Sequence, residues 1–299
     1  MRIGRIWIGD RSLYAVRDGD RVVSLSEVLA VDDDQIKDNI FPVWNESLDR
    51  LHRIDLSSYR TLGNDYRMLV PFDRIPNIRD FYAFEQHVIN GRRNRGLEMI
   101  KEWYEAPVFY FSNTSSLIAS GETVPFPMTS VEKDFEAEFA FIVAREGRDL
   151  TPSEAIDSII GVTCANDWSA RDIQRKEVKI GLGPAKAKDF ATSLGPWIIT
   201  MDELIPRIRE GVIDLPITAS INGKVYSRNN LNSMYWTVGD LVSKASESTR
   251  VVPGDVIMSG TVGNGSLLES GGGPMGWLKK GDSVVIEIDG SVRLVNTVG

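Results

Sequence analysis

The segment EKDFEAEFAF, residues 132–141, alternates aromatic and acidic side chains. In an extended strand, successive side chains point to opposite faces of the sheet. One face of a strand here carries Phe135, Ala137, Phe139 and Phe141. The other face carries Asp134, Glu136 and Glu138, with carboxylates about 7 Å apart. The aromatic face predicts a strand that packs against a core, and the acidic face needs a separate explanation.

Two explanations fit a row of like charges on one strand face. Antiparallel sheets often have one face in water, which would solvate the acids. Asp and Glu are poor strand formers, however, and a wet face more usually mixes Thr, Lys and Glu. The other explanation is a hard cation such as Mg²⁺ or Ca²⁺, which takes oxygen ligands and removes the repulsion between the carboxylates.

Composition sets the class of protein. The chain has 299 residues, 42% hydrophobic and 25% charged, which is typical of a globular protein with a real core. A net charge of −8 gives no electrostatic support for binding nucleic acid or an anionic membrane surface, and no run of about 18 apolar residues occurs. We therefore expect a cytoplasmic protein with no nucleic-acid or membrane partner.

Cysteine and histidine are scarce. Cys164 is the only cysteine, so an intrachain disulfide and a cysteine-based zinc site are both excluded. Its small and apolar neighbours favour a buried structural thiol over a catalytic nucleophile. The two histidines are His52 and His87, so a metal site must be built mainly from carboxylates. His52 is interpreted as a structural or surface residue.

The chain is predicted to hold two domains. Residues 1–72 form a small N-terminal α+β domain with a hairpin at Asp18-Gly19 and a helix within 32–54. The proline-containing segment VPFDRIP, residues 70–76, marks the boundary. Residues 73–299 form the larger domain.

The larger domain is predicted to be strands with a few short helices. Helical spacing occurs in 92–104, 151–161 and 200–211, and the last two begin with capping-box patterns at Thr151 and Thr200. Asn222-Gly223 is the strongest hairpin signal. Neither GxGxxG nor a Walker loop occurs, so a mostly β, α+β architecture is favoured over a doubly wound sheet.

Two further segments carry candidate chemistry. CANDWSARDIQRKE, residues 164–177, gathers acid, guanidinium and amide groups, which together can complete a metal site and bind an oxyanion. A helix start capped by Asp167 or Ser169, with Arg171 and Asp172 in water, explains it equally well. RDFYAFEQHVINGRRNRG, residues 79–96, places His87 before a basic, glycine-containing stretch that would serve as a mobile lid.

Taken together, DFYAFEQH, DFEAEFAF, NDWSARDIQ, AKDFATSLGPW and SGTVGNGSLLE resemble the fumarylacetoacetate hydrolase family. The motifs occur in the family's order between about residues 78 and 290. The resemblance implies the family's mixed β-sandwich roll with short helices, and it fits residues 1–72 only loosely. It also implies a divalent cation, Mg²⁺ or else Ca²⁺ or Mn²⁺, whose ligands would be Glu136, Glu138, Asp167 and Asp80. Asp134 would then be a solvent-side member of the row or a group behind the ligands.

The activity implied by the resemblance is hydrolysis of a C–C bond in a β-diketone or 2,4-diketo acid. By resemblance, His87 is the base that activates water and Glu269 is the carboxylate that orients it. Oxyanion stabilisation would fall to Lys188, Arg171 and Gln174. Substrate contacts would come from Tyr82, Tyr110, Arg95 and Thr261. Without the resemblance, the sequence would be interpreted to place Lys188 at the surface, Glu269 in a loop and Tyr110 in the core.

The sequence departs from the family pattern in places, and this leaves alternatives. Asn90 stands where the shorter acylpyruvate hydrolases usually place a glutamate, which favours the dyad with Glu269 and leaves the substrate open. An acylpyruvate-like diketo acid is preferred over fumarylacetoacetate itself. A 2-oxo acid decarboxylase, an isomerase or hydratase, and a Ca²⁺-stabilised binding protein are the alternatives. A homodimer is expected from the family, with Met234, Tyr235 and Trp236 as candidate contact residues.

Overall fold

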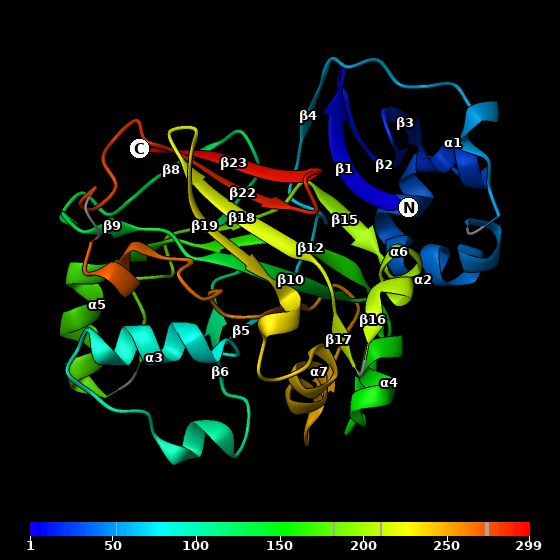
Figure 1. Ribbon diagram of the computed structural model, residues 1–299. Coiled ribbons are helices and arrows are strands. Elements are labelled where there is room, and N and C mark those ends of the chain that lie inside the picture. The colour runs from blue at the N-terminus through cyan, green and yellow to red at the C-terminus, as the bar shows by residue number, and fades with distance from the viewer. Residues whose placement is uncertain (52, 182, 210, 273–274) are drawn as a thin grey trace.

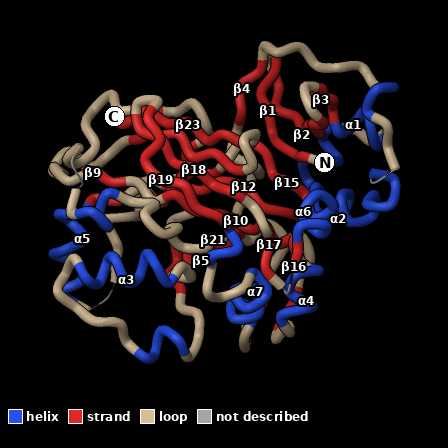
Figure 2. The backbone as a smooth tube through the Cα atoms, in the orientation of Figure 1, coloured by secondary structure: helices blue, strands red, loops and turns tan. Residues whose placement is uncertain are grey.

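Two β-sheets pack face to face at the centre of the computed structural model (Figure 1). The structure describes residues 1–51, 53–181, 183–209, 211–272 and 275–299, so His52 lies outside the described residues. Figure 2 shows the strands massed in the middle and the helices around them. The predicted mixed β-sandwich with short helices is therefore confirmed.

The larger sheet contains twelve strands among the described residues. Its main path runs β3 (Arg21–Ser24), β2 (Arg11–Asp18), β1 (Arg2–Ile8), β15 (Trp197–Thr200), β12 (Ile159–Asp167), β10 (Ala137–Val143), β21 (Val256–Met258), β5 (Ile78–Phe81) and β6 (Phe109–Ser112). Three more strands pair beside this path, namely β4 (Tyr66–Met68), β7 (Leu117–Ile118) and β14 (Thr192–Leu194).

The second sheet runs β19 (Lys224–Asn230), β18 (Pro216–Ile221), β22 (Ser283–Ile288), β23 (Val292–Val298) and β8 (Thr123–Val124). The predicted hairpin at Asn222-Gly223 joins β18 to β19, and both residues adopt positive φ as that turn requires. Short two-stranded pairs complete the strands, namely β9 (Lys133–Asp134) with β13 (Ser169–Ala170), β11 (Gly147–Arg148) with β20 (Arg250–Val251), and β16 (Ile208–Arg209) with β17 (Val212–Ile213).

Helices surround the sheets. The α-helices are α1 (Leu25–Leu29), α2 (Asp33–Leu51), α3 (Glu85–Arg93), α4 (Pro152–Asp157), α5 (Arg171–Glu177), α6 (Met201–Leu204) and α7 (Val238–Ser246). The 3₁₀ helices are η1 (Leu56–Ser58), η2 (Lys101–Tyr104), η3 (Val178–Ile180), η4 (Ile205–Arg207), η5 (Leu231–Ser233) and η6 (Leu267–Ser270). In Figure 1, α3 and α5 lie at one end of the sandwich and α1 and α2 at the other.

Some of the predicted helices form and others do not. The capping box at Thr151 is present and begins α4. The capping box predicted at Thr200 is wrong, because that hydroxyl contacts Met1 and Asp202 instead, and α6 ends after one turn. The helix predicted over 92–104 is also wrong. The helix in this region is α3, which begins at Glu85, and a turn follows it.

The alternating segment at 132–141 breaks into two strands at 135–136, where a single strand was predicted. Its aromatic side chains are buried in the core, as expected. Its acids Asp134, Glu136 and Glu138 are buried as well, with exposed fractions of 0%, 5% and 1%. The solvent explanation for the acidic face is therefore wrong, and so is a solvent-side position for Asp134.

Residues 1–72 contribute β1 to β4 to the same sheet as the rest of the chain. Residues Arg2, Ile3 and Gly4 of β1 pair with β15. The predicted hairpin joins β2 to β3, and its two turn residues are Gly19 and Asp20, one position later than predicted, because Asp18 pairs with Arg21. The division at residue 72 stays a prediction. Cys164 is fully buried between the sheets, where burial raises the pKa of its thiol, and this fits the structural role expected for it.

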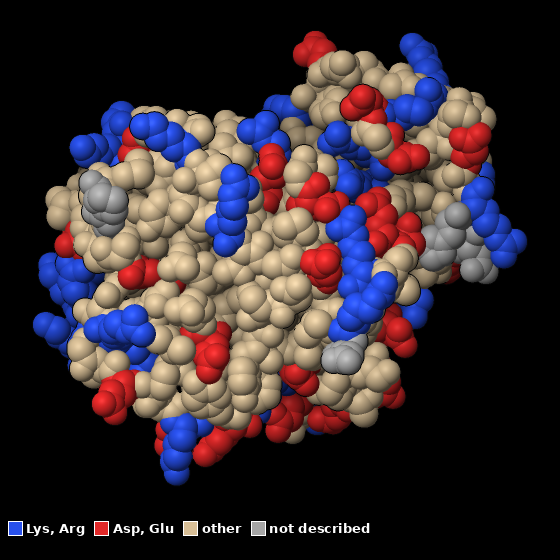
Figure 3. All heavy atoms as spheres, viewed as in Figure 1, with Lys and Arg blue, Asp and Glu red and all other residues tan. Residues whose placement is uncertain are grey.

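The surface carries both signs of charge. On the face drawn in Figure 3, Lys, Arg, Asp and Glu are interspersed around a broad area of other residues. Across the described residues, none of the helices combines the length and apolar character that a membrane crossing requires.

Gly161 of the central strand β12 allows β15 to approach closely. A Cβ atom at this position would lie 2.1 Å from the carbonyl oxygen of Ile199. We expect Gly161→Ala to lower the free energy of unfolding by about 1–3 kcal/mol through overpacking, measured by chemical denaturation. Gly63→Ala is the control, because a Cβ at Gly63 has no atom within 4 Å. Equal stability of the two variants would contradict this packing.

Candidate active site

A cavity of about 640 Å³ opens between α3, α5 and the ends of β5, β6 and β10. All of the predicted site residues except Asp167 and Glu269 line it, namely Asp80, Tyr82, His87, Arg95, Tyr110, Glu136, Glu138, Arg171, Gln174, Lys188 and Thr261. Asp167 and Glu269 lie behind this wall and contact Lys188 and His87. The fold thus gathers residues from five separate sequence motifs around one space.

Strand register brings the acidic residues together. Ala137 and Glu138 of β10 pair with Asn166 and Ala165 of β12, whose last residue is Asp167. On the other side of β10, β21 lies between it and β5, which carries Asp80. Four carboxylates therefore converge from three strands and the segment that leads into β10.

The four carboxylates are buried, and each feels the others. Burial and the neighbouring Asp167 raise the pKa of Asp80, and burial and Asp80 raise the pKa of Glu138. Burial also raises the pKa of Asp167, although Lys188 opposes the shift. Glu136 differs, because Lys188 and Arg171 outweigh burial and hold its pKa below the usual range.

Two buried cations compensate part of this negative charge. Lys188 is 5% exposed, and its ammonium contacts both Glu136 and Asp167. Arg171 is 1% exposed and donates from Nη2 to Glu136 Oε1 at 2.7 Å and from Nη1 to Gln174 Oε1 at 2.9 Å. The surface position considered for Lys188 and the helix cap considered at Asp167 or Ser169 are both wrong. Helix α5 begins at Arg171, after Ala170.

The donor set fits a hard divalent cation. Asp80 Oδ1 and Asp167 Oδ1 are buried and have no hydrogen-bond partner. Buried carboxylate oxygens without partners are costly unless a cation satisfies them, and Mg²⁺, Ca²⁺ and Mn²⁺ prefer oxygen ligands. Among the described residues, no three acidic, histidine or cysteine side chains already surround one point at metal-binding distance.

His87 and Glu269 form a hydrogen-bonded pair at the cavity wall. His87 Nδ1 lies 2.8 Å from Glu269 Oε1, and both side chains are buried. A carboxylate only accepts, so His87 donates from Nδ1 and keeps Nε2 free to accept a proton.

The stretch predicted to be a mobile lid forms helix α3 and the turn after it, and its mobility stays a prediction. Two side chains of α3 and its C-cap residue contact the segment around η6: His87 and Asn90 contact Glu269, and Asn94 Nδ2 donates to Leu268 O at 2.9 Å. These three residues are spaced three and four apart, so they share one face of the helix. The helix is thereby held over the cavity.

The remaining predicted contacts surround the acids. The Tyr110 hydroxyl contacts the carboxylates of both Asp80 and Asp167, so the core-packing alternative is wrong. Thr261 lies at the edge of the acidic cluster and contacts Glu138. Tyr82 packs edge-on against His87, with ring centroids 5.4 Å apart.

Arg95 differs from the other cations of the site because it is exposed at the mouth of the cavity. Its Nε donates to Gly91 O at 3.0 Å. It is therefore placed to meet a negatively charged group that enters from solvent.

Sequence reasoning missed the role of Asn90. Asn90 was interpreted only as a departure from a family pattern, but its Nδ2 donates to Glu269 Oε2 at 2.9 Å. The signal was present in the spacing, because residues three apart on a helix share a face and His87 precedes Asn90 by three.

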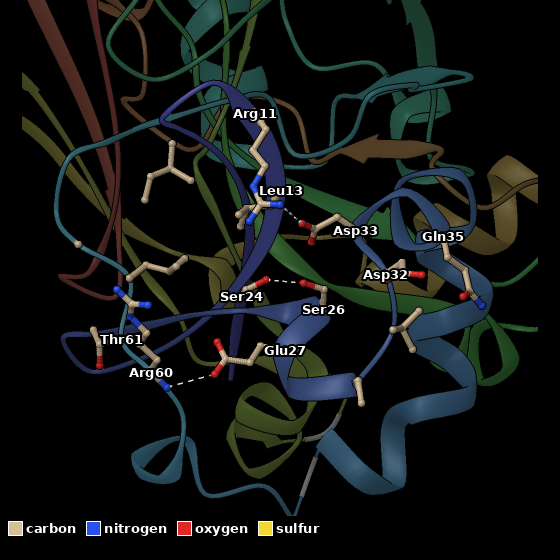
Figure 4. A pocket seen from close by; sticks show the side chains of 15 residues that line it. Arg11, Leu13, Ser24, Ser26, Glu27, Asp32, Asp33, Gln35, Arg60 and Thr61 are labelled. Carbon is tan, nitrogen blue, oxygen red and sulfur yellow. Dashed lines mark hydrogen bonds and ion pairs between the residues drawn. The ribbon is translucent and has the colours of Figure 1, made fainter.

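A second cavity of about 730 Å³ lies in the N-terminal part, between β2, α1 and residues 60–63 (Figure 4). Its walls carry mixed charge, including Arg11, which pairs with Asp33 at 3.1 Å, and Glu27. None of the predicted site residues lines it. The chemistry that the sequence predicts therefore belongs to the cavity around His87 and the four carboxylates.

Comparison with known proteins identifies the family of the chain. The family model described as fumarylacetoacetate (FAA) hydrolase C-terminal matches residues 77–299. The chain belongs to the fumarylacetoacetate hydrolase family. Fumarylacetoacetase of Mus musculus is 31% identical over 263 residues, covering 73% of this chain and 62% of that protein. The match thus spans less than two thirds of this curated relative.

Solved structures share the fold along the whole chain. Maleylpyruvate hydrolase from Sphingobium sp. SYK-6, in complex with manganese(II) and pyruvate, has a TM-score of 0.73 and 21% identity, covering 100% of this chain and 98% of that one. The 5-carboxymethyl-2-hydroxymuconate delta-isomerase from Mycobacterium smegmatis has a TM-score of 0.69 and 24% identity, with the same coverage of 100% and 98%. At these identities, the similarity establishes the fold alone.

Divalent cations are expected to stabilise the folded protein. An ion that binds only the folded state adds about 2.7 kcal/mol at a hundred times its Kd, so Mg²⁺ or Mn²⁺ raises the thermal unfolding temperature. Glu138→Ala removes one carboxylate and should abolish this shift and the calorimetric binding signal. Glu247→Ala, at a surface ion pair, is the control and should keep both. Unchanged Mg²⁺ binding in Glu138→Ala would contradict the site.

Proposed function

We propose that this protein is a divalent-metal-dependent hydrolase that cleaves a C–C bond in a 2,4-diketo acid of the acylpyruvate type. The observation that carries the proposal is the 2.8 Å contact of His87 with Glu269 at the wall of a cavity that three of the four buried carboxylates also line. A relative named fumarylacetoacetase and a neighbour crystallised with manganese(II) and pyruvate support it.

His87 is the proposed general base. Glu269 accepts from Nδ1 and so fixes the ring and the tautomer, which leaves Nε2 to take a proton from water. Asn90 and the backbone N–H of Asn264 hold the other oxygen of Glu269 at 2.9 and 2.7 Å. Because Glu269 is held on both oxygens, its hydrogen bond to His87 keeps one direction.

The metal site is proposed at Glu136, Glu138, Asp167 and Asp80, with Mg²⁺ preferred and Ca²⁺ or Mn²⁺ as alternatives. A bound divalent cation acts there as a Lewis acid for the oxygens of a 2-oxo acid. The Tyr110 hydroxyl contacts Asp80 and Asp167 and donates its one proton to either of them, which helps to orient these two carboxylates. With a cation bound at these carboxylates, the oxo-acid end of the substrate would lie on the acidic side of the cavity.

The bond changes follow from these positions. The water oxygen bonds to the acyl carbonyl carbon as His87 accepts its proton, and the carbonyl oxygen becomes an oxyanion. The bond from this carbon to the methylene carbon then breaks, and its electron pair leaves as the enolate of pyruvate. The enolate carbon takes up the proton that His87 accepted from water, which gives pyruvate and restores the base, and the acyl part leaves as a carboxylic acid.

Charge that develops during these steps is assigned to the cationic side of the cavity. Lys188, Arg171 and Gln174 are proposed to stabilise the oxyanion, because they meet at the wall beside Glu136. Substrate contacts are proposed for Tyr82, Tyr110, Arg95 and Thr261, which line the rest of the cavity.

The second candidate is a 2-oxo acid decarboxylase, or an isomerase or hydratase, on the same scaffold. A neighbour named as an isomerase has this fold. Decarboxylation and isomerisation need no activated water, so the buried pair of His87 and Glu269 favours hydrolysis. A calcium-stabilised binding protein would need neither this pair nor the buried Lys188.

Kinetics of single and double variants test the proposal. His87→Ala should lower turnover of an acylpyruvate by roughly 10²–10⁴, the usual worth of a general base, with little change in substrate affinity. Glu269→Gln should lose nearly as much, and the double variant little more, because the two residues act as a unit. The control reaction is oxaloacetate decarboxylation in the presence of Mg²⁺, which should survive His87→Ala far better. Intact acylpyruvate cleavage with abolished decarboxylation would exclude these roles.

We also propose that the protein is a homodimer and is located in the cytoplasm. Of the three residues predicted to face a partner, Met234 is buried and Trp236 packs against the core, which leaves Tyr235, 46% exposed. Tyr235 extends an aromatic cluster with Trp103 and Tyr104.

Sedimentation at micromolar concentration tests the dimer. We expect a mass of twice the 33.3 kDa of one chain, because closed two-fold dimers are the commonest oligomers. Tyr235→Glu should shift the mass toward one chain if this residue lies in the contact. A single-chain mass for the unaltered protein would rule the dimer out.

A further inference from the structure

Asp134 is a fully buried carboxylate that contacts none of the other acids through hydrogen bonds. Its Oδ1 accepts the backbone N–H groups of Phe135 and Leu267, both at 2.8 Å. Its Oδ2 accepts the N–H of Leu268 at 3.0 Å and Arg171 Nε at 2.7 Å. With four donors on two oxygens, the carboxylate has no face left for a metal ion or a substrate.

The groups that Asp134 holds belong to two different parts of the proposed machinery. Arg171 opens α5 and extends from Asp134 to Glu136 at the acidic cluster. Leu267 and Leu268 open η6, and the next residue is Glu269, the partner of His87. One carboxylate therefore joins the proposed oxyanion side of the cavity to the side that carries the base.

We propose that Asp134 is a positioning residue that fixes Arg171 and the turn bearing Glu269 relative to each other. This inference rests on the proposed function for the roles of Arg171 and Glu269. It requires an acceptor with two oxygens. The isosteric amide of asparagine has one oxygen, so its NH₂ group would face either Arg171 and Leu268 or Phe135 and Leu267, and donors would then meet donors.

The chain contains a matched control in Asp255. This carboxylate is also fully buried, and it accepts from Arg79 Nη1 at 2.8 Å, from Asn77 Nδ2 at 2.7 Å and from the N–H of Val252 at 3.2 Å. Asp255 lies outside the lining of the cavity around His87. Replacing it with asparagine disturbs an equivalent buried acid–arginine pair and leaves the proposed site alone.

The first test is hydrogen exchange of the Mg²⁺-loaded protein, followed by mass spectrometry, and it does not depend on activity. In Asp134→Asn, amides within 264–271 should exchange about tenfold faster or more, because the turn loses an acceptor that holds it closed. In Asp255→Asn, exchange in that segment should match the unaltered protein. Unchanged exchange within 264–271 in Asp134→Asn would overturn the proposal whether or not the protein hydrolyses diketo acids.

The second test is kinetic. Asp134→Asn should lower kcat for an acylpyruvate roughly 10- to 100-fold, the usual effect of a group that orients active-site residues, while KM changes less than about threefold. Asp255→Asn should keep kcat. Combining Asp134→Asn with Glu269→Gln should lower kcat by less than the product of the two separate losses, because part of the effect of Asp134 acts through Glu269. A fully multiplicative loss, or an equal loss of kcat in Asp255→Asn, would show a general structural role and overturn the proposal.

A further variant keeps the test decisive if Asp134→Asn does not fold. Asp134→Glu retains the charge beside Arg171 and moves the carboxylate by one methylene. It should show the same faster exchange within 264–271 and a reduced kcat. Normal exchange and normal kcat in Asp134→Glu would overturn the proposal. Absence of any diketo acid hydrolysis in the unaltered protein would instead refute the proposed function, with the exchange result still deciding what Asp134 holds.

Discussion

Burial of several like charges at one point is the constraint on which the site depends. Glu136, Glu138, Asp167 and Asp80 are each at most 5% exposed. Taking even one charge from a buried pair usually costs about 3–5 kcal/mol, so carboxylates in such a place require cations. Lys188 and Arg171 supply two, and both are buried with the acids they neutralise. Neither Lys188 nor Arg171 provides a hydrogen bond to Oδ1 of Asp80 or to Oδ1 of Asp167, and these two buried oxygens have no partner.

The β-sandwich serves this cluster by fixing where strands end. Asp167 is the last residue of β12, and Asp80 lies in β5 opposite Tyr110 of β6. Because β10 and β21 lie between β12 and β5, the carboxylates reach one space from neighbouring strands of a single sheet. Close backbone approach at Gly161 lets β15 pair with the other end of β12.

The wall of the cavity depends on a different kind of contact. Helix α3 and the turn η6 are joined by polar side chains, with His87 and Asn90 on one carboxylate and Asn94 on a backbone carbonyl. Asp134 binds the same turn by accepting hydrogen bonds from the backbone N–H groups of Leu267 and Leu268. Polar contacts of this kind are directional, so they fix the angle of the imidazole in a way that apolar packing of a helix does not.

The sequence by itself determined the strand that carries the acids, the hairpins, the capping box at Thr151 and the family motifs, because these depend on side-chain period or on local turn chemistry. It did not determine the break at 135–136, the start of α3 at Glu85, or the partners of each charge. Lys188 is 52 residues from Glu136, and Asp134 is 133 residues from Leu267. Strand register and the order of the strands in the sheets decide which acidic and basic residues, distant in the sequence, become neighbours. Local sequence patterns extend over a few residues and contain no information about contacts between residues so far apart in the chain. Only the tertiary structure could therefore show that Asp134 is buried and which groups it binds.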